Sequence, residues 1–433
     1  MELQAVRGTR DLLPGETEKW AEVEKWGRAV FAAFGYRELR TPLFEHTELF
    51  QRGVGETTDI VTKEMYTFED RKGRSLTLRP EGTAPVVRAY LEHHLGQGEA
   101  GQAKLYYLGP MFRYERPQAG RYRQFFQIGA EAIGYDHPSS DAESISMLVE
   151  FLARLGLSGL SVDLNTVGCP DCRPDYHREL LAFLKSREDR LSPDSRERLG
   201  RNPLRVLDSK LPQDIEATAG APKTFNFLCT SCSAHFAGVQ RHLGLLGVPF
   251  ELQARLVRGL DYYTRTVFEV KSGRLGAQNA VAGGGRYDQL VGQFGGPARP
   301  AVGFGVGLDR LMALLQESGA LIETEPEAHV AVVAVGEKAF PRCLALAHQF
   351  RRSLFNGFPV RTFLDLNPGR GVKSQMKRAS ASGATYAVIL GDEELAKGEA
   401  TVKDMVSEEQ FSAPLGNVVQ EIGARLELKG GKP

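Results

Sequence analysis

The chain has 433 residues, and its 54 basic and 54 acidic side chains leave no net charge that would draw it to a polyanion or a membrane. Its 42% hydrophobic and 25% charged residues are typical of a globular protein, and its length predicts two or three domains. It contains no apolar run of membrane-spanning length, no apolar signal core near its start and only five cysteines, so we expect a cytoplasmic protein without a secreted disulfide framework.

The N-terminal part alternates helical and extended patterns. Residues 16–34 have the spacing of an amphipathic helix, and a short strand over 36–41 ends before Pro42, which cannot donate to a central ladder. Residues 75–81 alternate like a strand, and Thr83 then stands where a helix cap is expected.

A long hairpin is predicted over residues 104–134, with the turn-forming sequence RPQAGR at its tip. Counting by two places polar residues such as Gln127 and Glu131 on one face and apolar residues such as Ile128 on the other. Residues 113–124 hold four arginines and two tyrosines against one glutamate. Arginine binds phosphate in a fork and aromatic rings stack on bases, whereas a solvated charged loop is the alternative.

The pattern changes between residues 169 and 245, where charged helical stretches alternate with proline-rich links. We expect an inserted, mostly helical subdomain there. Near its two ends lie two CxxC pairs, made of Cys169, Cys172, Cys229 and Cys232. This spacing is typical of a structural zinc site with four thiolate ligands, and four reduced thiols are the alternative.

The sequence LVRGLDYYTRTVFEV, residues 256–270, leads into a predicted strand that begins at Thr266. Arg258 and Asp261 stand among apolar and aromatic residues on the way into it. A buried charge costs several kcal/mol unless it is paired or meets a ligand. Arg258 therefore either has an internal acid partner, for which Asp261 is a local candidate, or waits for an anion.

Two glycine-rich segments follow. AGGGRYD, residues 282–288, is either a turn or a place where a substrate approaches the main chain. In the strand predicted before the helix around 308–315, alternate glycines at 303, 305 and 307 leave one face bare, for a flat ligand or for close packing. Arg310 lies in the first turn of that helix, where an anion is favoured. The GxGxG spacing does not match the dinucleotide fingerprint GxGxxG.

Residues 317–327 are predicted to be a linker, and the remaining chain alternates strands and helices as a small α/β domain does. A basic cluster in this domain consists of Arg370, Lys373, Lys377 and Arg378. A solvated helix face is the default interpretation of such a cluster.

Several segments together resemble one family. FRYERPQAGRYRQFFQIGAE and GFGVGLDRL resemble the second and third motifs of class II aminoacyl-tRNA synthetases, and GYRELRTPLFEHTELF resembles the first, which lies at the dimer interface in that class. LVRGLDYYTRTVFEV and AGGGRYDQLV resemble two segments peculiar to histidyl-tRNA synthetases, and TLRPEGTA extends the resemblance. The third motif usually reads Glu-Arg, whereas here Asp309 precedes Arg310, which leaves the key arginine in place.

The resemblance implies an α+β protein: a class II antiparallel β-sheet flanked by helices, with an inserted, mostly helical subdomain and a C-terminal α/β anticodon-binding domain. It implies a catalytic domain over residues 1–325, with the insertion at approximately 169–245, and an anticodon-binding domain over 326–433. It also implies a homodimer.

The implied activity is the activation of L-histidine by ATP with Mg²⁺ to histidyl-adenylate, followed by transfer to the 3′ end of tRNA(His). By resemblance, Arg113 and Arg258 are the catalytic residues that hold the α-phosphate from its two sides. The residues implied to bind ATP are Arg113, Glu115, Arg121, Phe125 and Arg310. Those implied to bind histidine are Glu81, Gly82, Thr83, Gln127, Glu131, Tyr262, Tyr263 and Tyr287. Those expected to contact tRNA are Arg116, Gln118, Lys373 and Lys377.

Two other classes of protein are weighed against this one. A synthetase-like regulatory subunit of histidine biosynthesis would lack both LVRGLDYY and the C-terminal domain, and this chain has both. A redox protein, or a zinc-dependent nucleic-acid-binding protein built on the CxxC pairs, would leave the arginines of the predicted ATP site unexplained.

Overall fold

The structure is a computed structural model that describes residues 3–55, 58–117, 120–272, 280–320, 322 and 324–428. The chain divides into two compact units, Met1–Glu323 and Thr324–Pro433, and each has a hydrophobic core of its own. Among the described residues, no helix combines the length and the apolar character that a membrane span requires.

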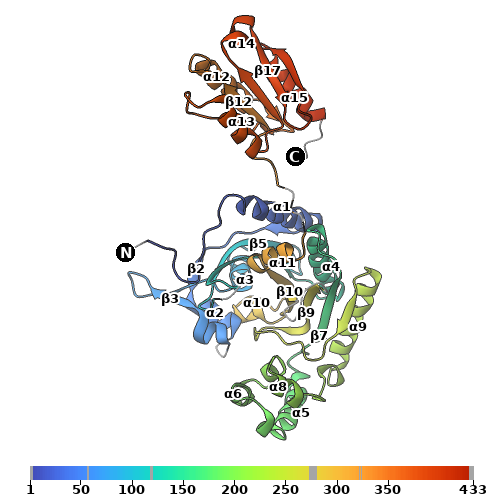
Figure 1. Ribbon diagram of the computed structural model, residues 1–433. Coiled ribbons are helices and arrows are strands. Elements are labelled where there is room, and N and C mark those ends of the chain that lie inside the picture. The colour runs from blue at the N-terminus through green and yellow to red at the C-terminus, as the bar shows by residue number, and fades with distance from the viewer. Residues whose placement is uncertain are drawn as a thin grey trace. The chain divides into compact units, whose positions relative to one another are not determined.

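An eight-stranded sheet organises the first unit, in the order β1-β5-β6-β11-β10-β9-β7-β8 (Figure 1). Its strands are β1 Arg37–Glu38, β5 Ala103–Phe112, β6 Gln124–Ile133, β7 Leu160–Thr166, β8 Phe250–Leu252, β9 Thr264–Ser272, β10 Ala280–Arg286 and β11 Ala301–Gly307. Only the edge strands β1 and β8 pair in parallel, while the strands between them pair antiparallel. The predicted antiparallel sheet is confirmed.

The predicted hairpin is formed by β5 and β6, and its register pairs Leu105 with Glu131 and Phe112 with Gln124. One face of the sheet, with Ile128 and Ala130, is buried under helices that share its main core. These helices are α1 Thr17–Ala33, α4 Ser139–Arg154, α9 Thr230–Leu245 and α11 Leu308–Glu317. The opposite face carries α3 Thr83–Glu92 and α10 Leu290–Gln293, and between them it presents polar side chains.

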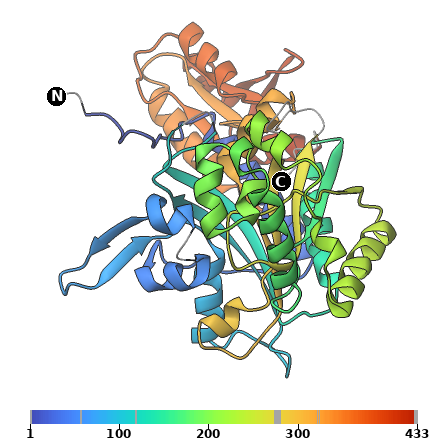
Figure 2. The same cartoon turned by 90° about the horizontal axis from the view of Figure 1, so that it is seen from below.

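A small three-stranded sheet, β2-β4-β3, lies beside α2 Thr47–Val54 and a π-helix, Ile60–Glu64. Its strands are β2 Phe44–His46, β3 Tyr66–Glu69 and β4 Ser75–Leu78. The hairpin of β3 and β4 projects from the first unit in both views (Figure 2). The strand predicted to reach Glu81 ends at Leu78, because Arg79 turns its guanidinium onto the carbonyl oxygens of Pro110 and Thr41.

The middle of the first unit is helical, as predicted for the insertion. It contains α5 Arg173–Lys185, α6 Pro193–Arg201, α7 Leu204–Leu207 and α8 Pro212–Ala217, with 3-10 turns at Glu188–Arg190 and Thr224–Asn226. These helices enclose a separate small core that includes Tyr176, Leu180 and Val206. The last helix of the predicted insertion, α9, differs, because its apolar residues belong to the main core and it packs against α4.

The second unit is an α/β sandwich around a five-stranded sheet, β15-β12-β16-β17-β18. Its strands are β12 Val330–Ala334, β15 Thr362–Leu364, β16 Tyr386–Leu390, β17 Glu399–Asp404 and β18 Gln410–Pro414, and a small ribbon pairs β13 Leu354–Phe355 with β14 Phe358–Pro359. Its helices are α12 Phe340–Arg352, α13 Val372–Ala381, α14 Asp392–Lys397 and α15 Val418–Leu428. The apolar face of α13 packs in a different cluster from those of α12 and α15, so both faces of the sheet are covered.

Candidate active site

A pocket opens on the polar face of the eight-stranded sheet and encloses about 440 Å³, its open mouth included. Strands β6, β10 and β11, the start of α3 and the segment before β9 all contribute to its wall. The sequence-predicted residues that line it are Glu81, Thr83, Arg113, Gln127, Glu131, Arg258, Tyr262, Tyr263 and Tyr287. The fold therefore brings together residues that lie up to about two hundred positions apart in the chain.

Glu131 lies on β6 at the buried end of the pocket. Its carboxyl accepts hydrogen bonds from the Thr83 hydroxyl at 2.7 Å and from the Tyr287 hydroxyl at 2.5 Å. Burial is the main cause that raises the pKa of Glu131 to about 8. The neighbouring carboxyl of Glu81 adds to this net shift, and the hydrogen bonds from the two hydroxyls oppose it. The empty pocket therefore holds this carboxyl mainly protonated at neutral pH, ready to ionise beside a cation.

Glu81, and not Thr83, caps helix α3. Its two carboxylate oxygens accept hydrogen bonds from the backbone N–H groups of Thr83 at 2.7 Å and Ala84 at 2.8 Å. Thr83 is already within the helix, so its hydroxyl is directed to Glu131 instead. Burial raises the pKa of Glu81, an effect that its hydrogen bonds to the helix N-terminus oppose. Gly82 precedes the helix and lies against Tyr107, which leaves no room for a Cβ atom.

The alternate glycines of β11 make room for side chains of the neighbouring strand. A Cβ atom at Gly303 would collide with the Glu131 carboxylate, and one at Gly305 would collide with the Gln127 amide. Gly307 has no heavy atom within 4 Å of such a position among the described residues. The expected bare face is thus filled from β6 at two of its three glycines, and it is the polar groups of β6 that face the pocket.

The three glycines of AGGGRYD lie in strand β10, which ends at Arg286, so their interpretation as a turn is wrong. β10 pairs with β9 on one side and with β11 on the other. A Cβ at Gly283 would lie 2.7 Å from a guanidinium nitrogen of Arg258, and one at Gly285 would lie 2.8 Å from the Tyr263 ring. The glycines therefore let both side chains lie flat on the sheet. Arg286 points to the other face, where it is fully buried and ion-paired with Asp141.

Arg258 has a carboxylate partner, but this partner is Glu269 of β9 rather than Asp261. Asp261 instead forms ion pairs and hydrogen bonds with Arg205 and Asn202 of the inserted helices. The reason is the register of the sheet, which places Glu269 beside Gly283 and hence under the Arg258 side chain. Arg258 remains 24% exposed and lines the pocket, so its pairing leaves it accessible to a ligand.

Two polar atoms of the pocket have no hydrogen-bond partner among the described residues. They are Oε1 of Gln127 and Nε of Arg258, and both are buried. Buried polar atoms are almost always hydrogen-bonded, and an exception indicates a missing partner. An acceptor and a donor are thus available to a ligand in the same pocket.

The predicted ATP residues lie along the hairpin that leads to this pocket. Arg113 is anchored by a hydrogen bond from Nε to the Pro80 carbonyl at 2.8 Å, and its guanidinium lies over the Phe125 ring at 5.4 Å. Glu115 lies 3.7 Å from both Arg113 and Arg121. Arg113 lines the pocket itself, whereas Glu115, Arg121 and Phe125 lie outside its wall.

Arg310 is half-buried in the first turn of α11, and burial together with the nearby Arg121 lowers its pKa. A Cβ atom on Gly120 at the hairpin tip would lie 3.7 Å from the Arg310 Cα, so this tip reaches the start of α11. The preceding Asp309 accepts a hydrogen bond from the Phe126 backbone at 2.8 Å and pairs with Arg10. Two cations from separate motifs therefore lie near each other, as an anion site requires.

The remaining predicted residues lie elsewhere. Arg116 is exposed beside the hairpin tip, and Gln118 lies outside the described residues. Lys373 and Lys377 are exposed on α13 of the second unit. The other two cations of that basic cluster, Arg370 and Arg378, both pair with the carboxylate of Asp365, which the local sequence did not indicate as their partner.

The four cysteines of the two CxxC pairs converge, and their sulfur atoms all lie within 4.8 Å of one another. Sequence reasoning missed two other polar side chains, Tyr107 in the pocket wall and Glu269 beneath Arg258. Tyr107 has the same strand parity as Arg113, so counting by two could have found it. Nothing in the local sequence could have indicated Glu269, because its contact depends on the pairing of β9 with β10.

Comparisons with known proteins agree with this geometry. Residues 8–311 match the family described as histidyl-tRNA synthetase, and residues 329–425 match the anticodon binding domain family. The chain is 48% identical to a histidine–tRNA ligase of Halothermothrix orenii, over 98% of this chain and 99% of the relative. It is 50% identical to a histidine–tRNA ligase of Desulforudis audaxviator, again over 98% and 99%.

Among solved structures, the chain is similar to an apo histidyl-tRNA synthetase of S. aureus, with a TM-score of 0.80 and 35% identity over 98% of this chain and 100% of that one. A weaker likeness of fold, with a TM-score of 0.61 and 24% identity, links it to an ATP phosphoribosyltransferase regulatory subunit/histidyl-tRNA synthetase from Bacillus halodurans, over 90% of this chain and 98% of that one. The match along the full length at nearly half identity decides between these likenesses, and the chain belongs to the histidyl-tRNA synthetase family.

Proposed function

We propose that the pocket activates L-histidine with magnesium-bound ATP and that the second unit helps to bring tRNA(His) to it. In the first step a carboxylate oxygen of histidine attacks the α-phosphorus, and the bond to pyrophosphate breaks. In the second step the terminal ribose hydroxyl of the tRNA attacks the carbonyl carbon, and AMP leaves. The observation that carries this proposal is the pocket itself, which holds two carboxyl groups and two arginines on one sheet face.

The polar groups at the inner end suit histidine. A neutral imidazole has one donor and one acceptor. Glu81 accepts from the ring N–H, since its helix bonds leave it further lone pairs, and Tyr263 completes the ring contacts. Glu131, Gln127, Thr83 and Tyr262 hold the α-amino end, with Tyr287 and Gly82 shaping the wall. An apolar mimic would leave these groups unpaired and would be rejected strongly.

The arginines suit the phosphates. Adenylate formation needs positioned cations more than a nucleophile from the protein. Arg113 and Arg258 hold the α-phosphate from its two sides, while Arg310, helped by Arg121, takes the γ-phosphate. Glu115 accepts from the adenine amino group. The adenine ring stacks on Phe125, with Arg310 opposing it. Arg113 is hydrogen-bonded to the Pro80 carbonyl and Arg258 is ion-paired with Glu269, so both guanidinium groups are held in place before the reaction begins.

The domain roles follow from the two units. We assign residues 1–325 to catalysis, with the insertion near 169–245, and residues 326–433 to anticodon binding. Separate cores support this division, and the second unit presents Lys373 and Lys377 to solvent. Arg116, which is exposed beside the hairpin tip, and Gln118 are also assigned to tRNA binding. A cytoplasmic location fits this work.

A homodimer is also proposed, through the small sheet of the first unit. Phe44 on β2 and Phe68 on β3 are 51% and 44% exposed, and their rings contact each other at 6.4 Å between centroids. Leu43 beside them is exposed as well. Large apolar side chains gathered on a surface mark interaction sites. Sedimentation analysis of the full chain tests this, and Phe44→Asp combined with Phe68→Asp should give monomers.

Histidine-dependent exchange of labelled pyrophosphate into ATP tests the proposed chemistry. We expect exchange only when histidine is supplied, and charging of tRNA(His) but not of other tRNAs. A chain that binds histidine without exchange would be a regulatory subunit instead. Chemistry built on the cysteines would be independent of ATP, so the same assay separates all three classes of protein.

A further inference from the structure

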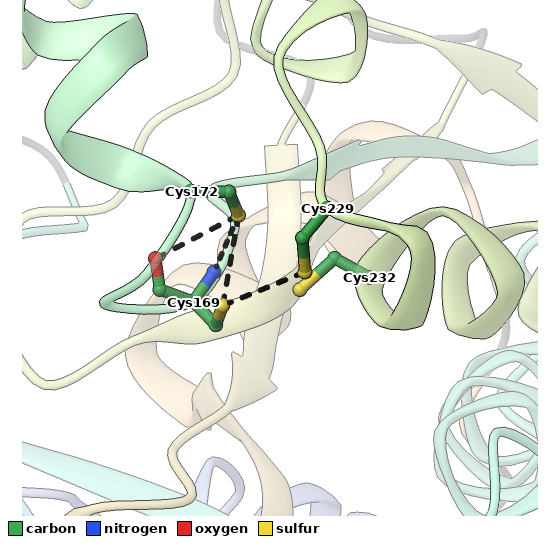
Figure 3. Close-up of side chains that lie close together, drawn as sticks. All are labelled: Cys169, Cys172, Cys229 and Cys232. Atoms are coloured by element: carbon green, nitrogen blue, oxygen red, sulfur yellow. Dashed lines mark hydrogen bonds between the residues drawn. The ribbon is translucent and has the colours of Figure 1, made fainter.

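The four cysteines near the ends of the insertion form a cluster that the proposed chemistry does not use (Figure 3). Cys169 and Cys172 come from the turn before α5, and Cys229 and Cys232 come from the start of α9. Cys172 and Cys232 are buried, and the other two are half-buried. Two knuckles that lie 60 residues apart in the chain thus meet at one point.

The sulfur geometry fits a tetrahedral metal and not disulfides. The Sγ atoms of Cys169 and Cys172 lie 3.6 Å apart, and those of Cys169 and Cys229 lie 3.8 Å apart. A disulfide needs about 2.05 Å between its sulfur atoms. Four thiolates around zinc at about 2.3 Å would lie about 3.8 Å from one another, by the geometry of a tetrahedron.

Backbone groups of the first CxxC pair lie against the sulfur atom of Cys172. Cys172 Sγ accepts a hydrogen bond from the Cys169 backbone N–H at 3.2 Å. Gly168 adopts a φ of +68°, and a Cβ atom there would lie 2.8 Å from the same sulfur. Cys172 and Cys229 are the N-cap residues of α5 and α9, so each pair of cysteines is placed by the start of a helix.

The charged side chains near the cysteine cluster also suit a metal bound by four thiolates. A zinc ion with four thiolates carries a net charge of −2. Arg173 follows Cys172 directly, and Arg265 donates a hydrogen bond to Ser231, inside the second knuckle, at 3.4 Å. Two guanidinium groups therefore border the cluster. Thiolate sets of this kind select zinc or iron, and not magnesium or calcium.

We propose that Cys169, Cys172, Cys229 and Cys232 bind one structural Zn²⁺, which clasps the two ends of the insertion to the pocket. Arg173 donates to the Tyr263 carbonyl at 2.7 Å, and the Arg265 backbone N–H donates to the Gly168 carbonyl at 2.8 Å. Tyr263 lines the pocket, so the clasp holds the segment that carries it. This metal takes no part in the adenylation chemistry.

Metal analysis of the full chain without a histidine tag tests the proposal. We expect about one zinc per chain after growth in zinc-supplemented medium, and loss of at least nine-tenths of it in Cys169→Ser and in Cys229→Ser. Cys343→Ser is the matched control, because Cys343 is a lone buried cysteine of the second unit, and it should keep the metal. Mercurial titration should release the zinc as four thiols react.

A second measurement keeps the test decisive if the serine variants fail to fold. The unaltered chain, grown with cobalt in place of zinc, should show the absorption of tetrahedral thiolate-bound Co²⁺. Less than a tenth of a zinc per chain together with four freely reacting thiols would overturn the site. Iron in its place would overturn the assignment to zinc, and zinc retained in both serine variants would place the metal elsewhere. None of these outcomes depends on synthetase activity.

Discussion

At the scale of single residues, Arg258 has a structural contact in the sheet, and we propose a chemical role for it as well. Its guanidinium pairs with Glu269, yet it stays 24% exposed and keeps Nε without a partner among the described residues. An arginine held in this way is preorganised, so its contribution is expected in the transition state more than in binding.

Replacing Arg258 by alanine tests this role. We expect histidine-dependent pyrophosphate exchange to slow by at least ~100-fold, with much smaller changes in the KM values. Lysine should rescue only part of the rate, because it lacks the planar fork. Arg255→Ala is the matched control, since Arg255 bonds only inserted helices among the described residues and should leave the rate nearly unchanged. A folded Arg258→Ala with normal turnover, but a loss of about 3–5 kcal/mol in unfolding free energy, would make this arginine purely structural.

The raised pKa of Glu131 leads us to predict that the protein releases protons when histidine binds. Its pKa of about 8 means that at pH 7 roughly nine in ten empty pockets hold it protonated. The ammonium group of bound histidine stabilises the carboxylate and lowers this pKa, so binding at pH 7 should release up to about 0.9 proton. Calorimetry in buffers of different ionisation enthalpy measures the release, and Glu131→Gln should abolish it. No buffer dependence in the unaltered chain would contradict the assignment.

The same shift has a consequence for stability. The folded pKa lies above the unfolded value of about 4.5, so the folded state holds the extra proton between these two values. The stability that this proton contributes is present below pH 4.5 and is lost as the pH rises through 8. The unligated chain should therefore lose part of its stability towards pH 8, and Glu131→Gln should lose less over the same range.

At the scale of elements, the pocket depends on glycines placed across a ladder from long polar side chains. β11 pairs with β6 so that Gly303 faces Glu131, and the Gln127 amide lies over Gly305. Space on one strand is thereby used by the side chains of the next. This arrangement is a property of two strands in register and of neither strand alone.

Gly303→Ala should disturb this arrangement, because its Cβ would collide with the Glu131 carboxylate and lie 2.5 Å from the Ala130 carbonyl oxygen. We expect a loss of about 1–3 kcal/mol in unfolding free energy, as for other overpacked sites. Gly307→Ala lies on the same strand and face, with no described atom within 4 Å of its Cβ, so it should cost far less. Denaturant unfolding of both variants measures the difference, and equal losses would refute the steric explanation.

At the scale of the whole molecule, the chain divides after residue 323 into two units, and each unit has its own hydrophobic core. The proposed adenylation site consists only of groups of the first unit, whereas the anticodon-binding match lies in the second. A chain cut after Glu325 should therefore keep much of its pyrophosphate exchange and lose most of its tRNA charging at limiting tRNA. Exchange in the same preparation is the control for folding. Unchanged charging by the shortened chain would show that the second unit is dispensable for tRNA.

Most of the elements, and the family, can be predicted from the sequence alone. The hairpin, the glycine-rich strand β11, the small α/β unit and nine residues of the pocket wall all follow from periodicity, turn residues and motif resemblance. These features are local or repeat along the chain, so a sequence displays them directly. The convergence of the two CxxC pairs was likewise suggested by their spacing alone.

The partners of individual side chains, by contrast, depend on how the strands are assembled into the sheet. Asp261 was the nearest acid to Arg258 in sequence, but sheet register gave that place to Glu269. The triple glycine likewise lies in a central strand because β10 pairs on both of its sides. In the same way, the pairing of β6 with β11 places Gln127 and Glu131 over the glycines of β11. Contacts between distant strands depend on the alignment of whole ladders, in which a shift by one residue reverses every side chain. That information is spread over the entire sheet, so no single segment of the sequence displays it.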